Sequence, residues 1–176
     1  MKKLCIVLGL IFAASPAFAQ HRGNPPFTPT TVHWKDIVGV ITAQQVNNPI
    51  SANISSGTFA WSTSSGQASV DLATGATSFD VEGLVINGTQ FSGTPGPITA
   101  VTGTLVCNPG DPDNEMALDT AVVPLNARGD ANFSGFIPSI PATCANPLFL
   151  VRIAVPVGAA GRWIATGAVR VGGTQQ

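Results

Sequence analysis

The chain of 176 residues contains no tyrosine, only two histidines and few charged residues. Asp, Glu, Lys and Arg together make up 10% of the sequence, whereas a typical soluble domain has about 25%. Two histidines fall short of the three protein ligands of a typical catalytic zinc site. The composition therefore disfavours a catalytic metal centre, and Ser, Thr, Asn, Gln and Gly must cover most of the surface. Such a surface is typical of exported bacterial β proteins.

Long apolar runs are also absent, except at the start of the chain. Lys2 and Lys3 precede the apolar run Leu4–Ala14, and the small-residue sequence Ala17-Phe18-Ala19 follows it. This order is that of a secretory signal peptide. The run is too short for a membrane-spanning helix, which needs about 20 residues. We therefore expect a signal helix over residues 1–19, cleavage after Ala19, and a secreted or periplasmic protein without a membrane span.

Basic residues are scarce in the remaining chain. Cleavage removes 19 of the 176 residues, including two of the eight basic ones and none of the nine acidic ones, which leaves a formal charge of −3. The remaining basic residues do not cluster: Arg22, Lys35, Arg128, Arg152, Arg162 and Arg170. Without a basic surface, neither nucleic acid nor an anionic membrane surface is an expected partner.

Cysteine is the last scarce residue, with three in the whole chain, and Cys5 lies within the signal. Cys107 and Cys144 then form an even pair in an oxidising compartment, which predicts one disulfide. The bridge would close a loop of about 38 residues and stabilise the fold by about 4 kcal/mol in the chain-entropy model. The two cysteines are not spaced as C-x-x-C and have no neighbouring histidine, so a redox-active or metal-binding pair is disfavoured.

Short runs of Val, Ile, Thr and Phe fill residues 32–172, separated by Gly, Pro, Asn and Asp. This spacing predicts an all-β fold, a single antiparallel β-sandwich of about 8–9 strands. A flexible Pro- and Gly-rich leader, residues 20–31, precedes this domain, and residues 173–176 form a tail. The predicted strands are Val32–Ala43, Ala52–Ser62, Gln67–Ala73, Ser78–Asn87, Ile98–Cys107, Asp119–Asn126, Ala131–Ile137, Pro147–Val155 and Gly161–Val171.

Two of these strands have informative patterns. Residues 79–82 alternate between apolar and acidic side chains, which predicts one buried and one solvated face. Residues 148–155 are apolar on both faces except at Arg152, which predicts a central strand covered on both sides. Because a buried unpaired charge is costly, the guanidinium of Arg152 must reach water or a carboxylate. Asp80, Glu82 and Asp119 are its candidate partners.

The longest polar insert, residues 108–115, is a candidate calcium site. Carboxylate and amide oxygens on a flexible loop suit calcium, which takes about 6 to 8 oxygen ligands. The spacing matches no known calcium loop, so a solvated turn is the competing interpretation. The candidate ligands are the carboxylates of Asp111, Asp113 and Glu115, supplemented by Asn108, Asn114 and Asp119.

Candidate catalytic residues are few. The chain has no G-x-S-x-G motif, and its serines lie in Ser- and Gly-rich turns. Asp80 and Glu82 share one strand face about 7 Å apart, a separation that a glycosidase can use, although alternating acids are also ordinary on a solvated face. His21, close to the expected new amino terminus, is a candidate copper ligand. His33 is expected on a strand surface beside an interior Trp34.

The three tryptophans, Trp34, Trp61 and Trp163, allow two interpretations. Aromatic rings on a flat face stack against sugars, but each tryptophan also lies within an apolar strand pattern, which favours the core. Trp61 and Trp163 are kept as candidate ligand-binding residues.

The second half of the chain resembles exported bacterial proteins of unknown function. The resembling segments are Val101–Cys107, Pro124–Leu125, Gly129–Gly135, Pro147–Arg152 and Gly161–Ala165. More distantly, they are similar to the chordin-type CHRD module, which implies a β-sandwich with a comparable order of strands. This chain lacks the His-containing strand typical of that module, so the resemblance implies a fold and no metal-dependent activity.

These observations lead us to expect a secreted, non-catalytic bacterial β-sandwich protein. Its expected role is binding or structural at the cell exterior, without a cofactor, with an extracellular protein or glycan as the partner. The alternative is a small secreted hydrolase with an acidic site. Acids or histidines converging in one pocket would favour the hydrolase, whereas a flat face exposing Trp61 or Trp163 would favour a binding protein.

Overall fold

The computed structural model describes residues 30–155 and 160–173. Within these ranges the chain forms eleven strands and no helix, which confirms the all-β prediction. The predicted signal, its cleavage site at Ala19, almost all of the leader and the last three residues lie outside the described ranges. The strands are β1 (Thr31–Gly39), β2 (Trp61–Ser62), β3 (Ser65–Asp71), β4 (Ala76–Glu82), β5 (Val85–Ile86), β6 (Ala100–Cys107), β7 (Met116–Asp119), β8 (Val123–Pro124), β9 (Ala131–Phe136), β10 (Leu148–Ala154) and β11 (Ala160–Gly172).

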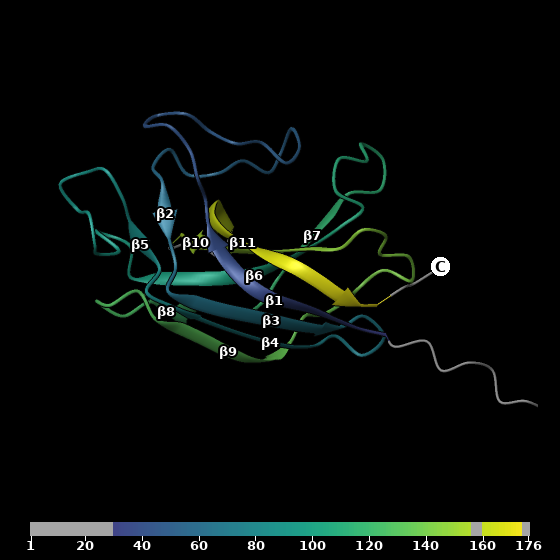
Figure 1. Cartoon of the computed structure of the whole chain (residues 1–176). Coiled ribbons are helices and arrows are strands. Elements are labelled where there is room, and N and C mark those ends of the chain that lie inside the picture. The colour runs from purple at the N-terminus through teal and green to yellow at the C-terminus, as the bar shows by residue number, and fades with distance from the viewer. Residues whose placement is uncertain (1–29, 156–159, 174–176) are drawn as a thin grey trace, which may run out of the picture.

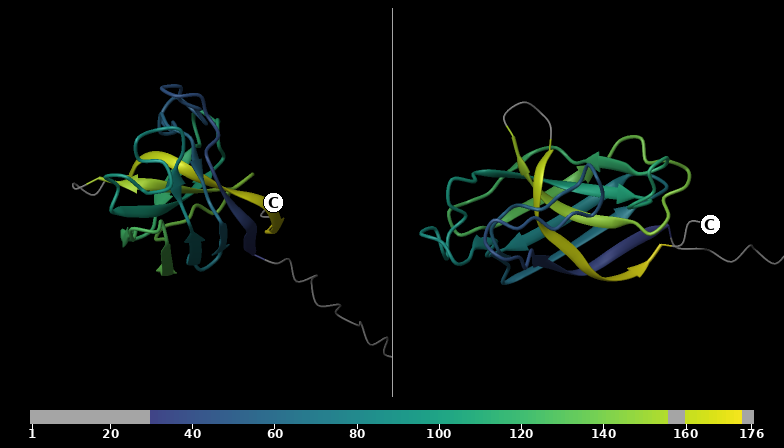
Figure 2. Two further views of the ribbon diagram at one scale, coloured as in Figure 1. Left: turned by 60° about the vertical axis from the view of Figure 1, so that its left-hand side comes forward. Right: turned by 90° about the horizontal axis from the view of Figure 1, so that it is seen from above.

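Nine of these strands form one antiparallel sheet, in the order β7-β6-β10-β11-β1-β3-β4-β9, with β8 paired to β6. The long strand β11 connects two layers of this sheet: its first half pairs with β10 and its second half with β1. One layer contains β6 and β10, and the other contains β1, β3, β4 and β9 (Figure 1). Figure 2 shows β11, in yellow, crossing between them. The short pair β2 and β5 lies at one end.

Aromatic side chains fill the space between the two layers. The ring of Phe149 on β10 lies 5.6 Å from the rings of both Trp34 on β1 and Phe79 on β4. Gly103 on β6 faces the same cluster, and a Cβ at this position would lie 2.7 Å from Phe149 and 2.8 Å from Phe79. A glycine is therefore required here because the opposite rings approach the backbone. The two layers pack face to face, as in a sandwich.

Both strand patterns are confirmed. Strand β4 alternates strictly between exposed and buried residues. Strand β10 is paired on both edges, with β6 and β11, and its residues Phe149, Leu150 and Val151 are completely buried.

The predicted disulfide is also present: Cys107, at the end of β6, is bonded to Cys144, and both residues are buried. The bridge ties the end of β6 to the segment that leads into β10.

Three predicted strand boundaries are wrong. Predicted strand Ala52–Ser62 is reduced to its last two residues, because Ser56 turns its hydroxyl inward to accept a hydrogen bond from the backbone N–H of Asn48 (2.7 Å). Predicted strand Ser78–Asn87 is interrupted at Gly83, whose φ is +62°. Predicted strand Asp119–Asn126 retains only Asp119, the last residue of β7, and the two residues of β8; between them the Thr120 hydroxyl accepts a hydrogen bond from the Gly103 N–H (3.0 Å). In each case a side-chain hydrogen bond or a turn replaces part of the strand ladder.

The partner of Arg152 is Asp119. Their closest atoms, Nη1 and Oδ1, are 3.9 Å apart, and the guanidinium also donates to the backbone oxygens of Gly161 and Ala160, both at 2.7 Å. Asp80 and Glu82 lie on β4, in the other layer. Burial lowers the pKa of Arg152, while the neighbouring charge of Asp119 opposes this effect. The two carbonyl oxygens thus accept hydrogen bonds from two of the five N–H donors of the partly buried guanidinium.

In the described ranges, the chain has no helix long and apolar enough to cross a membrane.

Candidate functional site

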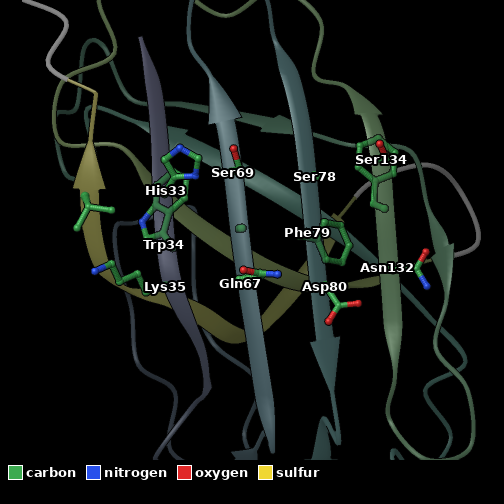
Figure 3. A pocket seen from close by; sticks show the side chains of 13 residues that line it. His33, Trp34, Lys35, Gln67, Ser69, Ser78, Phe79, Asp80, Asn132 and Ser134 are labelled. Atoms are coloured by element: carbon green, nitrogen blue, oxygen red, sulfur yellow. The ribbon is translucent and has the colours of Figure 1, made fainter. Parts of the chain in front are cut away.

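A shallow hollow of about 760 Å³ lies on the outer face of the layer formed by β1, β3, β4 and β9. Two rows of polar side chains cross it from strand to strand (Figure 3). We call these eight residues the polar face. The first row is His33, Ser69, Ser78 and Ser134, which are paired in register, and the second row is Lys35, Gln67, Asp80 and Asn132.

The strand alternation explains why these side chains point outward. Their neighbours in sequence, Trp34, Ala68 and Phe79, are buried between the layers. Because successive side chains of a strand point to opposite faces, burial of one set fixes the other set in water. Phe79 and Phe133 stack beneath the face with ring centroids 5.9 Å apart. The polar face therefore lies directly over packed, apolar side chains.

The side chains of the polar face form no hydrogen bond or ion pair with any other described residue. Outside the polar face, on the same strands β3 and β4, Ser65 donates a hydrogen bond to Glu82 (2.9 Å). Lys35 and Asp80 carry opposite charges, but they stand two strands apart with Gln67 between them, a backbone separation of about 10 Å. These groups keep their hydrogen-bonding capacity for water or for a ligand.

The arrangement does not form a catalytic relay. His33 and Asp80 are two strands and two residues apart, about 12 Å along the sheet, so their side chains do not meet. Only Asp80 of the predicted acidic pair lines the hollow, whereas Glu82 bonds to Ser65. What the face offers is a set of donors and acceptors: hydroxyls, carboxamides, an imidazole, an ammonium and a carboxylate.

Two of the three carboxylates of the predicted calcium site, Asp111 and Glu115, accept hydrogen bonds from the protein itself. Asp111 accepts hydrogen bonds from the backbone N–H groups of Asp113 (3.0 Å) and Asn114 (3.2 Å) and from the Asn114 carboxamide (3.2 Å). These bonds, led by that from the Asn114 side chain, lower the pKa of Asp111. Glu115 accepts from the Ser51 hydroxyl (2.6 Å) and the Gly110 N–H (2.8 Å).

No three His, Cys, Asp or Glu side chains gather closely enough to hold a metal ion in residues 30–155 and 160–173. Calcium binding by Asp111, Asp113 and Glu115 stays a prediction. His21, the candidate copper ligand, lies outside the described residues. His33 is exposed beside Trp34, which is buried, as expected.

Trp61 and Trp163 are buried, with 4% and 7% of their surface exposed, so the core interpretation is confirmed. The indole Nε1 of Trp163 is the one buried side-chain polar atom without a hydrogen-bond partner among the described residues. Trp61 forms part of the wall of a second, smaller hollow. Neither ring forms a flat exposed platform.

Most of the polar face is not evident from the sequence. Of its eight residues, only His33 and Asp80 are considered as candidate site residues from the sequence, and not Lys35, Gln67, Ser69, Ser78, Asn132 or Ser134. A signal was present, because each of the four predicted strands that form this face carries polar residues two positions apart, such as Gln67 and Ser69. What the sequence lacks is the information that these strands are neighbours.

No protein-family model, curated protein or solved structure matches this chain. The resemblance to exported bacterial proteins and to the CHRD module therefore stays a prediction.

Proposed function

We propose that this chain is an exported bacterial protein, secreted or periplasmic after cleavage at Ala19, that binds a ligand without catalysing a reaction. The signal-like sequence of residues 1–19 supports export. The disulfide between Cys107 and Cys144 supports it independently, because such bridges persist in oxidising compartments.

The observation that carries the binding proposal is the polar face, with its eight side chains unbonded to the rest of the described chain. Its fixed charges balance, because Lys35 and Asp80 have opposite signs. A neutral ligand rich in hydroxyl groups therefore suits it better than a polyanion. We propose a glycan of the cell exterior, which would lie across the strands and bond to the carboxamides and hydroxyls.

The test is a titration of the mature protein with oligosaccharides of glucose and of N-acetylglucosamine, followed by NMR. We expect shifts at the resonances of Gln67, Asp80 and Asn132. The triple variant Gln67→Ala, Asp80→Ala, Asn132→Ala should bind at least about tenfold more weakly, since each lost hydrogen bond contributes about 0.5–1.5 kcal/mol.

The matched control is the triple variant Gln44→Ala, Asn53→Ala, Asp113→Ala, which removes the same side-chain types from exposed positions elsewhere. It should bind as the unmodified protein does. Equal weakening by both triple variants, or no shift with any oligosaccharide, would contradict the proposal. If the unmodified protein instead cleaves the oligosaccharides to shorter ones, and the Asp80→Asn variant does not, the alternative function is established, a hydrolase with an acidic site.

A further inference from the structure

A second hollow, of about 210 Å³, is lined by residues of β2, β5, β10 and β11 and of the loops beside them. Figure 1 shows the short strands β2 and β5 at one end of the fold. It shares no residue with the polar face. Segments far apart in the sequence build it: the chain around β2, the loop after β5, and the neighbouring strands β10 and β11. The residues that matter for its chemistry are Phe59, Trp61, Ile86, Phe91, Ile98 and Arg162.

The walls of this hollow are apolar. Trp61 and Ile86 form a buried floor, with 4% and 3% exposed, while Phe59 and Phe91 are partly exposed at the rim, with 37% and 41%. Gly96 lies close to two of these side chains: its φ is +59°, and a Cβ there would lie 3.0 Å from Ile86 and 3.3 Å from the Phe91 ring. Two exposed aromatic rings over an apolar floor favour an apolar ligand group.

Arg162 is the one charged residue among those that line the hollow. Its Nη1 donates to the backbone oxygen of Ser56 (3.1 Å), and its other nitrogens have no hydrogen-bond partner among the described residues. All nine acidic residues of the chain lie within residues 30–155, and the two ion pairs that the described residues form involve Arg128 and Arg152. Arg162 is therefore a cation without a carboxylate partner beside an apolar hollow.

We propose that this hollow binds a small carboxylic acid with an aryl or short acyl group. The apolar group packs against Trp61 and between the Phe59 and Phe91 rings, and the carboxylate accepts hydrogen bonds from Arg162, which binds carboxylates in a planar fork. The volume of about 210 Å³ lies below the range of about 300–1,000 Å³ for drug-sized ligands. The ligand is therefore of the size of benzoate or hexanoate.

The test compares acids with neutral molecules of the same shape. The mature protein is titrated with benzoate and hexanoate, and with benzyl alcohol and 1-hexanol, and binding is followed by tryptophan fluorescence and by ligand-observed NMR. Because the chain has no tyrosine, its emission comes from tryptophan alone. We expect the acids to bind about five- to tenfold more tightly than the alcohols, as one exposed charge-assisted contact provides.

Variants separate the two halves of the site. Arg162→Gln should abolish the preference for acids while the alcohols bind unchanged, and Arg162→Lys should keep part of it. Phe91→Ser should weaken acids and alcohols alike. Arg128→Gln, which removes an arginine from a turn elsewhere, should change neither.

Three results would overturn the proposal. The first is equal binding of acids and alcohols by the unmodified protein. The second is an acid preference that survives in Arg162→Gln, and the third is no binding of any probe at millimolar concentration. Failure of the oligosaccharide experiment would leave this site unaffected, because the two hollows share no residue.

Discussion

The polar face and the loop of residues 108–115 contain the same kinds of side chain but use them differently. In the loop, Asn108, Asp111 and Glu115 all hydrogen-bond to backbone or side-chain groups of the fold. On the polar face, Gln67, Asp80 and Asn132 form no such bond with any described residue. The position of a polar residue in the fold, more than its type, decides whether it is available to a ligand.

Backbone hydrogen bonding explains the difference. Strand residues have their N–H and C=O groups satisfied by the ladder, so their outward side chains are not needed by the backbone. Loop residues have no ladder, and side chains such as Asn and Asp satisfy the backbone in its place. We therefore expect substitutions in the loop to lower stability and substitutions on the polar face to lower binding.

The largest expected effect comes from removing the disulfide between Cys107 and Cys144, which closes the segment that contains the loop of residues 108–115. The double variant Cys107→Ala, Cys144→Ala should lower the free energy of unfolding by about 2–4 kcal/mol, because the denatured chain regains the entropy of an open loop. Urea denaturation measures this change. Single alanine substitutions on the polar face should stay within about 0.5 kcal/mol of the unmodified protein. Equal urea midpoints for the double variant and the unmodified protein would show that the bridge does not stabilise the fold.

A smaller effect is expected from one asparagine in each region. The Asn108 side chain donates to the Asn114 backbone oxygen (3.0 Å) and accepts from the Ala145 N–H (2.9 Å), and its own φ is +53°. Asn108→Ala should lower the free energy of unfolding by about 1–3 kcal/mol, since it leaves these groups unbonded and places a less tolerant residue at positive φ. Asn132→Ala is the matched control on β9.

Comparable losses for Asn108→Ala and Asn132→Ala would contradict the division between a structural loop and a binding face. Thermal unfolding of both variants, followed by circular dichroism, provides a second measurement of the same difference.

The same distinction shows what the sequence could predict. Alternation in β4 and the apolar run of β10 predicted burial correctly, because burial follows from side-chain period alone. The bridge between Cys107 and Cys144 was predictable because only two cysteines lie outside the predicted signal. These features depend on local pattern or on counting.

The polar face and the Arg152 pair depend on which strands are neighbours. Gln67 and Asp80 are neighbours because β3 pairs with β4, and Asn132 joins them because β9 pairs with the other edge of β4, 48 residues after β4 ends. Asp119 was one of three candidates for Arg152, and the order of strands β7, β6 and β10 selected it. Neither the strand neighbours of the polar face nor those of Arg152 can be inferred from a single sequence.

The smallest expected effect is a loss of stability at low pH, caused by protonation of carboxylates that accept hydrogen bonds within turns. Hydrogen bonds lower the pKa of three of them: Asp71, mainly through the Ala73 N–H; Asp111, mainly through the Asn114 side chain; and Asp130, mainly through the Asn126 side chain. A carboxyl whose pKa is lower in the folded chain than its ordinary value of 3.8 stabilises the fold above that value. The stabilisation disappears as the pH falls through the folded pKa.

The urea midpoint should therefore fall between about pH 5 and about pH 2.5. The effect is small because these carboxylates are solvent-exposed and screened. In Asp111→Asn the midpoint should be lower at neutral pH and should fall less steeply in acid, whereas Asp80→Asn, which breaks no bond of the fold, should keep the unmodified midpoint at neutral pH. A lower neutral-pH midpoint for Asp80→Asn would mean that the polar face also supports the fold, and the proposed separation of binding from stability would fail.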